Sequence, residues 1–78
     1  MNSAVDDVLE FLAEYDIGLP IGVLDNNLER SHSTIGRALG ELEDRGYVAR
    51  DENYNSHYRI TARGREYLRG ERDAAEDA

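Results

Sequence analysis

The segment 29–48 constrains the fold of this 78-residue chain more than any other part of it. Ser31 is placed to cap a helix, because a serine hydroxyl accepts hydrogen bonds from the free amides of the first turn. Apolar residues then recur at helical spacing over about residues 32–45 and define one buried face: Ile35, Ala38, Leu39 and Leu42. Gly46 suits the position after a helix, where a left-handed residue satisfies the last carbonyls. The segment is therefore predicted to form a capped helix that is followed at once by a strand.

Polar residues gather on the solvent-facing side of the N-terminal half of this helix: Arg30, His32, Ser33, Thr34 and Arg37. Arginine can donate two hydrogen bonds to guanine N7 and O6, and serine and threonine can contact phosphates or base edges. This layout is typical of a helix that reads a DNA groove. The acidic residues Glu41, Glu43 and Asp44 lie at the far end and are expected to stay away from phosphates. Gly40 is expected to serve packing, and Gly36 either packing or close approach to DNA.

Two helices are predicted before this segment. Ser3 caps the first, which carries an apolar stripe flanked by Phe11: Val5, Val8, Leu9, Leu12 and Tyr15. A turn follows at residues 16–18, in which Ile17 is expected to point inward. Pro20 suits the first position of a short second helix, which buries Ile21, Leu24 and Leu28. The pair Asn26 and Asn27 favours its end.

A β-hairpin and a last helix are predicted after the segment. Residues 47–50 and 57–61 form two strands, with Tyr58 and Ile60 on one face and Arg59 on the other. The polar stretch 51–56 between them is rich in turn-forming residues. Thr61 then caps a helix that ends at about Arg69. The fold class is therefore mainly α with a small hairpin, over residues 1–70, and residues 71–78 are expected to be an acidic, disordered tail.

Composition excludes several function classes. The chain has no cysteine, and two histidines on different elements, His32 and His57, are weak evidence for a metal site. The chain shows no glycine-rich phosphate loop, no nucleophile paired with a base and no HExxH pattern, so we expect neither an enzyme nor a cofactor. No apolar run approaches the length of about 20 residues that spans a membrane. The acidic N-terminus does not resemble a secretory signal, so a cytoplasmic location is expected.

The net charge of −8 argues against nucleic acid at face value, but the charge is unevenly distributed. Residues 1–29 contain acids and no Arg or Lys, whereas all nine basic residues, every one an arginine, lie between Arg30 and Arg72. The predicted DNA-reading helix therefore lies in the net-positive part. Abundant acid without lysine resembles the proteomes of salt-loving archaea. At about 1 M salt the Debye length is only about 3 Å, so an acidic surface repels DNA less.

Three stretches resemble winged helix-turn-helix proteins: residues 30–39, the junction 42–50 (Leu-Glu-Asp-Arg-Gly-Tyr-Val-Ala-Arg) and residues 58–68, which begin Tyr-Arg-Ile-Thr-Ala-Arg-Gly. With the lysine-free composition, they are similar to the small haloarchaeal phage-repressor-like (phiH repressor-like) proteins over about residues 4–70. The second helix departs from that pattern at Gly22 and the Asn-Asn pair. The resemblance implies three helices, a two-stranded wing and a C-terminal helix. It also implies a sequence-specific DNA-binding regulator, repressor-like and usually a homodimer.

This resemblance places the third helix in the major groove and the wing, 47–61, on the backbone or the adjacent minor groove. The predicted DNA-binding residues are Arg30, Ser31, His32, Ser33, Thr34, Arg37, Arg50, Asn53, Tyr54, Asn55 and Arg59. The first helix, with Phe11, and the last helix are the predicted dimer surfaces. Two alternatives stay open: a protein-interaction module, favoured by the net acidity, and a ligand-sensing regulator with a pocket at the dimer interface. A continuous positive strip over the third helix and the hairpin would favour DNA, whereas acids covering that strip would favour a protein partner.

Overall fold

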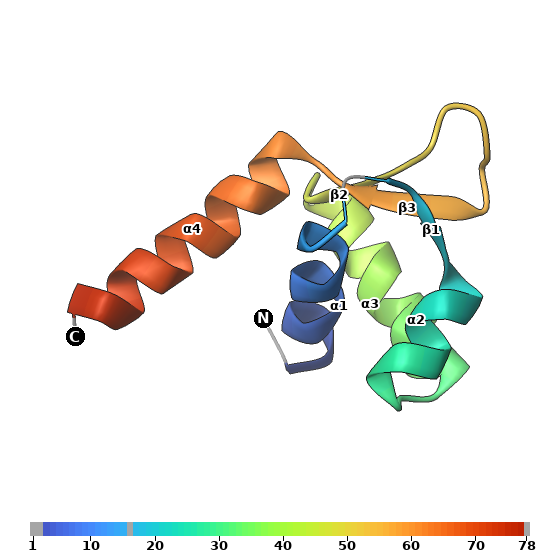
Figure 1. The fold of residues 1–78 in the computed structure, drawn as a ribbon, viewed down its shortest axis with the longest axis horizontal. Helices are drawn as coiled ribbons and strands as arrows, with labels where there is room; N and C mark the ends of the chain where they lie inside the picture. Colours follow the sequence, from blue (N-terminus) through green and yellow to red (C-terminus); the bar gives the residue numbers. More distant parts are fainter. Residues whose placement is uncertain (1–2, 16, 78) are drawn as a thin grey trace.

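Four helices and a small sheet make up the computed structural model, which describes residues 3–15 and 17–77, with side chains described as far as Gly70. The elements in chain order are α1 (Ser3–Ala13), β1 (Leu19–Pro20), α2 (Ile21–Leu28), α3 (His32–Asp44), β2 (Val48–Arg50), β3 (His57–Ile60) and α4 (Ala62–Asp77). Helices α1, α2 and α3 pack together beside the sheet, while α4 extends away from α2 and the hairpin (Figure 1). The predicted winged helix-turn-helix fold, mainly helical with a small sheet, is confirmed.

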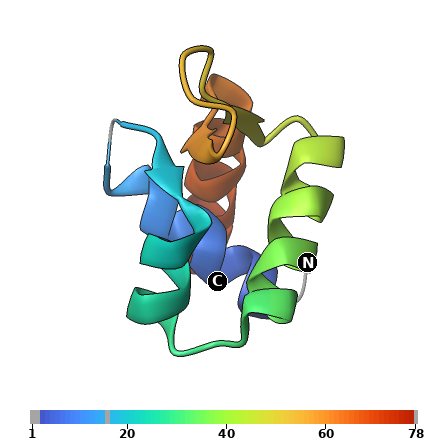
Figure 2. The same ribbon diagram turned by 90° about the vertical axis from the view of Figure 1, so that its right-hand side faces the viewer.

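The predicted apolar stripes of the first and third helices form the core, except for Tyr15, which follows the end of α1 and is 41 % exposed. The side chains with less than 2 % exposure all come from α1, α2 and α3: Val5, Val8, Leu9, Leu12, Leu24, Ile35, Leu39 and Leu42. Helices α2 and α3 stand on either side of α1 and are joined by a short turn at one end, with the hairpin at the other end (Figure 2). The helix periodicity of the sequence thus identified the buried face of the helix-turn-helix, because burial of these aliphatic side chains is the main force that holds the helices together.

The sheet has one strand more than predicted. Its order is β1-β3-β2, all antiparallel, with Leu19 opposite Tyr58 in β1 and β3. Pro20 ends β1 and is the N-cap of α2, so its predicted place as the first helical residue is wrong by one position. A two-residue strand has no periodicity of its own. It exists only because the chain between α1 and α2 passes the free edge of β3, and proline is tolerated at such an edge.

Two local expectations before α3 are also wrong. Ile17 is 63 % exposed instead of pointing inward, because Leu19 takes the inward position as the chain enters the sheet. The Asn pair does not end α2, which continues to Leu28 and stops at Glu29 in the left-handed conformation, with φ of 52°. Asn27 instead donates from Nδ2 to the Val23 carbonyl oxygen one turn back, at 2.8 Å. The Asn27 side chain thus makes a hydrogen bond within the helix and does not form the helix-ending turn that asparagine often favours.

The junction between the hairpin and α4 is tightly built. Thr61 caps α4 as predicted, because its Oγ1 accepts from the Gly64 amide at 3.1 Å. The same hydroxyl donates to the Gly46 carbonyl oxygen at 2.7 Å, and the Thr61 amide donates to the Tyr47 carbonyl oxygen at 2.9 Å. Gly46 has the predicted left-handed conformation, with φ of 78°. A Cβ atom at Gly64 would collide with the Tyr47 carbonyl oxygen and lie 2.8 Å from Ile60 Cγ1. Only glycine lets α4 begin this close to the backbone of Tyr47.

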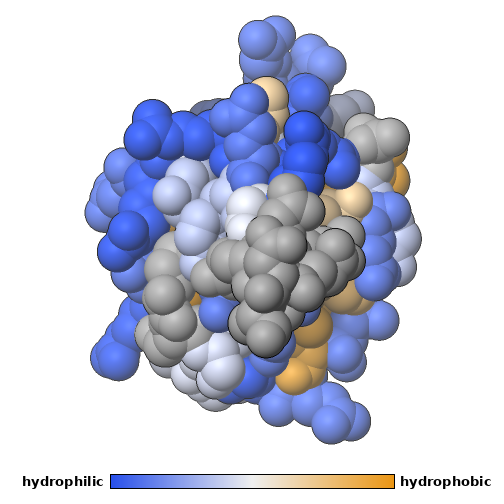
Figure 3. Space-filling model, turned by 90° about the vertical axis from the view of Figure 1, so that its left-hand side faces the viewer, coloured by the Kyte–Doolittle hydropathy of each residue, from blue (hydrophilic) through white to orange (hydrophobic). Residues whose placement is uncertain are grey.

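Helix α4 extends to Asp77, past its predicted end at Arg69. Leu68 is buried and Tyr67 is half-buried against the core, so the first part of α4 packs as expected. The side chains from residue 71 onward lie outside the described part, and the domain boundary at residues 70/71 stays a prediction. Figure 3 shows the molecule from the left-hand side of Figure 1, where the described surface is mostly hydrophilic and apolar atoms are confined to small areas.

Candidate nucleic-acid interface

The N-terminal end of α3 forms as the sequence indicates. Ser31 Oγ accepts from the Thr34 amide at 3.2 Å and lies 2.8 Å from Thr34 Oγ1. The residues of α3 that are exposed in its first ten positions are His32, Ser33, Gly36, Arg37 and Gly40. Thr34 is half-buried and lies on the side of the helix that faces α1, where it lines a shallow groove together with Ala4 and Arg37. The exposed face of α3 therefore consists of one histidine, one arginine and three small residues.

The two glycines keep this face narrow. A Cβ atom at Gly40 would meet nothing within 4 Å, and one at Gly36 would meet only Ile21 Cδ1, at 4.0 Å. The expectation that Gly40 serves packing is therefore wrong for the described residues. Each glycine in a helix interior costs about 1 kcal/mol of stability relative to alanine, and no packing contact within the described chain offsets that cost. The backbone of α3 is open to whatever approaches this face.

Arg37 is the free cation of the exposed face. Within the described residues its guanidinium has neither a hydrogen bond nor an ion pair, and the residue is exposed. All five of its donors are available to a ligand. Arginine presents these donors as a planar fork that fits a guanine edge or a phosphate.

The two basic residues that flank the start of α3 are paired with acids. Arg30 Nη2 donates to Asp7 Oδ2 of α1 at 2.6 Å, and the exposed fraction of its side chain is 32 %. The expectation that Arg30 faces solvent beside Arg37 is wrong, because the acidic face of α1 lies near enough to bind it. His32 Nδ1 lies 2.6 Å from Asp25 Oδ2 of α2. The His32 side chain is nevertheless 71 % exposed.

The pairing of the hairpin separates its two arginines. Arg50 lies opposite Tyr58, and Arg59 lies opposite Ala49. Because directly opposed residues share a face and neighbours alternate, Arg50 and Arg59 lie on opposite faces of the sheet. Arg59 lines a depression with Tyr15 and Arg65, away from α3. The structure therefore brings Arg50, but not Arg59, to the side of the hairpin that adjoins α3.

Arg50 contacts α3 through an acid. Its Nε donates to Glu43 Oε2 at 3.4 Å, and its guanidinium carbon lies 5.3 Å from the centre of the Tyr58 ring. Glu43 was expected to stay away from phosphates, but the structure places it against Arg50, one of the predicted DNA-binding residues. Neither neighbour of Arg50 was predicted from the sequence. The strand register would have indicated Tyr58, since a two-strand pairing puts it directly opposite Arg50, whereas no sequence signal places Glu43 there.

The hairpin tip is held by its own hydrogen bonds. Asp51 Oδ1 accepts from the Asn53 amide at 2.8 Å, and the His57 amide donates to the Tyr54 carbonyl oxygen at 2.9 Å. The rings of Tyr54 and His57 stack, with centroids 5.2 Å apart. Tyr54 is nevertheless 63 % exposed, and Asn53 and Asn55 are exposed too. The predicted tip residues are therefore available to a ligand.

The predicted residues lie near both ends of α3: one group at its N-terminal half and the other on the hairpin beyond its C-terminal end. The α2–α3 turn and the hairpin loop lie beyond opposite ends of α3 (Figures 1 and 2). A helix of 13 residues is about 20 Å long at 1.5 Å per residue. This length matches about six base pairs of duplex at a rise of about 3.4 Å. The surface is not a continuous positive strip, however, because carboxylates of Asp7, Asp25 and Glu43 adjoin Arg30, His32 and Arg50.

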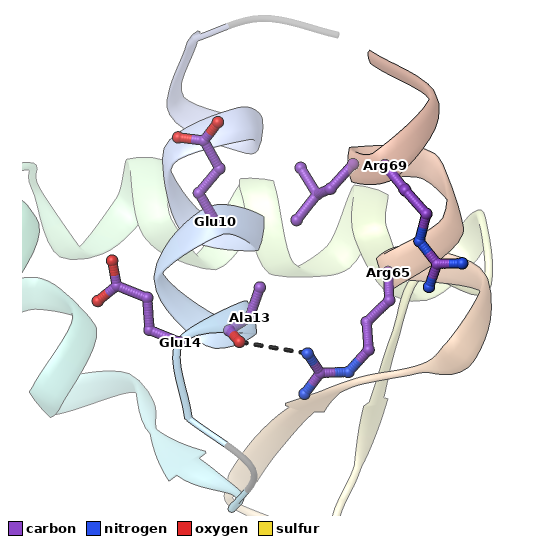
Figure 4. A pocket seen from close by; sticks show the side chains of 6 residues that line it. Glu10, Ala13, Glu14, Arg65 and Arg69 are labelled. Atoms are coloured by element: carbon purple, nitrogen blue, oxygen red, sulfur yellow. Dashed lines mark hydrogen bonds between the residues drawn. The ribbon is translucent and has the colours of Figure 1, made fainter. Parts of the chain in front are cut away.

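A second surface lies between α1 and α4. A groove there is lined by Glu10, Ala13, Glu14, Arg65, Leu68 and Arg69. Arg65 Nη1 donates to the Ala13 carbonyl oxygen at 3.3 Å and ties α4 to the end of α1. In Figure 4 the glutamates project from α1 on the side away from the arginines of α4. The groove thus has an acidic edge, a basic edge and a floor that includes Leu68.

The described residues contain neither a cluster of metal ligands nor a candidate membrane-spanning helix. Across residues 3–15 and 17–70, no three His, Asp or Glu side chains come together as ligands for an ion. None of the helices that the structure describes has the length and apolar character that a bilayer crossing requires.

Comparison with known families matches a large part of the chain to a DNA-binding domain family. The profile of the IclR helix-turn-helix domain family matches residues 7–52, which run from α1 through β2 into the hairpin loop. The matched segment covers more than half of the chain and includes all of α2 and α3. No curated protein and no solved structure matches the chain.

Proposed function

We propose that this chain, which belongs to the IclR helix-turn-helix domain family and is therefore a DNA-binding transcription regulator, recognises a specific double-stranded sequence and acts as a repressor. Family membership points to a regulator without enzymatic activity. The observation that best supports this proposal is the exposed face of α3. There Arg37 has no partner among the described residues, and two glycines leave the helix narrow. Such a face fits into a major groove about 12 Å wide.

In this proposal each predicted residue has a role that follows from its placement. Arg37 and Ser33 lie on the exposed face and reach base edges. The N-terminus of α3, with Ser31, Thr34 and His32, receives a phosphate, because amides at a helix start favour an anion. On the hairpin, Arg50 and the tip residues Asn53, Tyr54 and Asn55 contact the backbone or the minor groove. Arg30 can contact DNA only if its ion pair with Asp7 breaks. Arg59 can contact DNA only if the duplex bends around the sheet, because it lies on the face opposite Arg50.

The acidic composition of the chain suits DNA binding at high salt concentration. The net charge of −8 and the absence of lysine support a role in the salt-rich cytoplasm of an organism related to the haloarchaea, where short-range contacts outweigh screened long-range repulsion. The resemblance to phage-repressor-like proteins supports repression. Binding measurements should therefore include molar potassium chloride as well as dilute buffer.

Specific binding is tested by selecting duplexes from a random DNA library with the unchanged protein. We expect one sequence family to be enriched, and we expect Gly36→Gln to lower affinity for it at least about tenfold, which corresponds to about 1.4 kcal/mol. The reason is that a long side chain on the exposed face holds α3 away from the base edges. The same change should raise the thermal stability of the protein, because glutamine favours a helix interior over glycine.

Gly70→Gln is the matched control. Gly70 is an exposed helical glycine of α4 with nothing within 4 Å of its Cβ position, so the variant should gain stability without losing DNA affinity. Equal affinity of Gly36→Gln and the unchanged protein would refute the placement of α3. Enrichment of no sequence at any salt concentration would refute specific DNA binding itself.

A homodimer is part of the proposal, and the α1–α4 groove is its proposed interface. A two-fold interface uses the same patch of both copies, so that patch must be complementary to itself. The acidic edge of one copy would face the basic edge of the other, and the reverse contact would form at the same time. We expect sedimentation equilibrium near physiological salt to give a dimer, and Arg69→Glu to shift it towards monomer. The double change Glu10→Arg and Arg69→Glu should restore the dimer. A monomer for the unchanged protein would exclude this assembly.

A protein-interaction module is the second candidate function. It is favoured by the carboxylates of Asp7 and Asp25, which already occupy Arg30 and His32 on the side of α3 where DNA would bind. This alternative predicts that the library selection enriches nothing, and that neutralising Asp7 with Asp7→Asn leaves DNA binding undetectable.

A further inference from the structure

We infer that Glu43 and Tyr58 are positioning residues that hold Arg50 in a fixed orientation for a DNA phosphate; this inference rests on the proposed DNA-binding function. Arg50 is the last residue of β2 and shares a face of the sheet with Val48, which is buried. Tyr58 lies directly across from it in β3. The inner face of the hairpin therefore changes from core to surface at this pair of residues.

Arg50 is restrained on two sides. Its guanidinium carbon lies 5.3 Å from the centre of the Tyr58 ring, within the range of a cation–π contact. Its Nε donates to Glu43 Oε2 at 3.4 Å, so α3 and the hairpin are joined through this side chain. Half of the Arg50 side chain is still exposed.

The groups that hold Arg50 leave most of its donors unused. The contact with Glu43 uses Nε, and within the described residues the two terminal amino groups have no partner. These amino groups carry four N–H donors. An arginine that is already ordered loses less side-chain entropy when it binds a phosphate than a freely rotating one does. Glu43 and Tyr58 thus prepare Arg50 for a contact at the hairpin end of α3.

The direction in which DNA affinity changes when the Glu43 carboxylate is removed separates a positioning role from simple repulsion of phosphates. A carboxylate beside a DNA-binding surface repels phosphates, so its removal should tighten binding. If Glu43 positions Arg50, its removal should weaken binding, although the protein becomes less negative. Asp44 provides the comparison, because it is the next residue of α3, is exposed and has no ion pair among the described residues.

The experiment measures the affinity of Glu43→Ala and Asp44→Ala for the selected duplex over a range of salt concentrations. Each variant removes one negative charge and places alanine in the same helix. We expect Glu43→Ala to bind about three- to tenfold more weakly than the unchanged protein, and Asp44→Ala to bind equally or more tightly. In the Arg50→Ala background, Glu43→Ala should no longer weaken binding.

Conservative variants provide an independent readout. Glu43→Gln keeps an oxygen that can accept from Arg50 Nε and should retain most of the affinity. Tyr58→Phe keeps the ring and should bind like the unchanged protein, whereas Tyr58→Leu should lose affinity to a similar extent as Glu43→Ala. Circular dichroism confirms that each variant is folded.

The outcomes separate this inference from the function on which it rests. Tighter binding by Glu43→Ala, equal to that of Asp44→Ala, would overturn the inference while the proposed function stands. Weaker binding by Glu43→Ala that persists in the Arg50→Ala background would also overturn it. Failure of the unchanged protein to bind any duplex would overturn the proposed function, and the inference with it.

Discussion

Gly64→Ala is expected to destabilise the protein by about 3 kcal/mol, because the added methyl group collides with the backbone of Tyr47, the residue just before β2. The colliding atom is the Tyr47 carbonyl oxygen, which is itself fixed as the acceptor of the Thr61 amide at 2.9 Å. Relief of the collision requires α4 to move, and that would break the cap that Thr61 provides. We expect the midpoint of thermal unfolding, followed by circular dichroism, to fall by roughly 10 to 20 °C for a domain of this size.

Gly70→Ala is the control for the change of residue type. Gly70 lies in the same helix, and a Cβ atom there would meet nothing within 4 Å. Its replacement should stabilise the protein by up to about 1 kcal/mol, the intrinsic preference of a helix for alanine. A Gly64→Ala protein that unfolds at the same temperature as the unchanged chain would show that the α4 junction can relax without cost.

Arg37→Ala is expected to cost about 1–3 kcal/mol of binding free energy for the selected duplex, or roughly five- to 150-fold in affinity. Arg37 is exposed and has no partner among the described residues, so its loss leaves no unpaired acid and should leave the free energy of unfolding unchanged. If Arg37 reads a base pair, discrimination at one position of the sequence should relax as well. Titration of the duplex and of its single-base variants measures both effects.

Two variants decide whether Arg37 acts through shape or through charge. Arg37→Lys keeps the charge but loses the planar fork, so it should retain non-specific affinity and lose discrimination at that position. Arg45→Ala removes the same charge from the far end of α3, where Arg45 pairs with Glu41 at 3.3 Å, and should have a small effect on affinity at every sequence. Full discrimination by Arg37→Lys would exclude a direct base contact by this residue.

The elements that local physics dictates could be predicted. The cap at Ser31, the buried stripe of α3, the left-handed Gly46 and the cap at Thr61 all follow from short-range rules and are found in the structure. Elements that depend on a distant partner could not be predicted. Strand β1 exists only beside β3, and Ile17 is exposed because Leu19 takes the inward position.

The candidate site shows the same division. Helical spacing alone indicated which side of α3 faces outward, and Arg37 lies there. The pairing of Arg30 with Asp7 and of Arg50 with Glu43 joins residues on different elements, and no spacing rule relates such residues. The separation of Arg59 from Arg50 follows from strand alternation once the hairpin pairing is known.

Sequence by itself determined the order of the helices, their buried faces and the position of the arginine that faces outward, because each of these depends on neighbours within one or two turns of the chain. Tertiary structure alone decided which charges are neutralised and which remain free, because an ion pair depends on the distance between groups that only folding brings together.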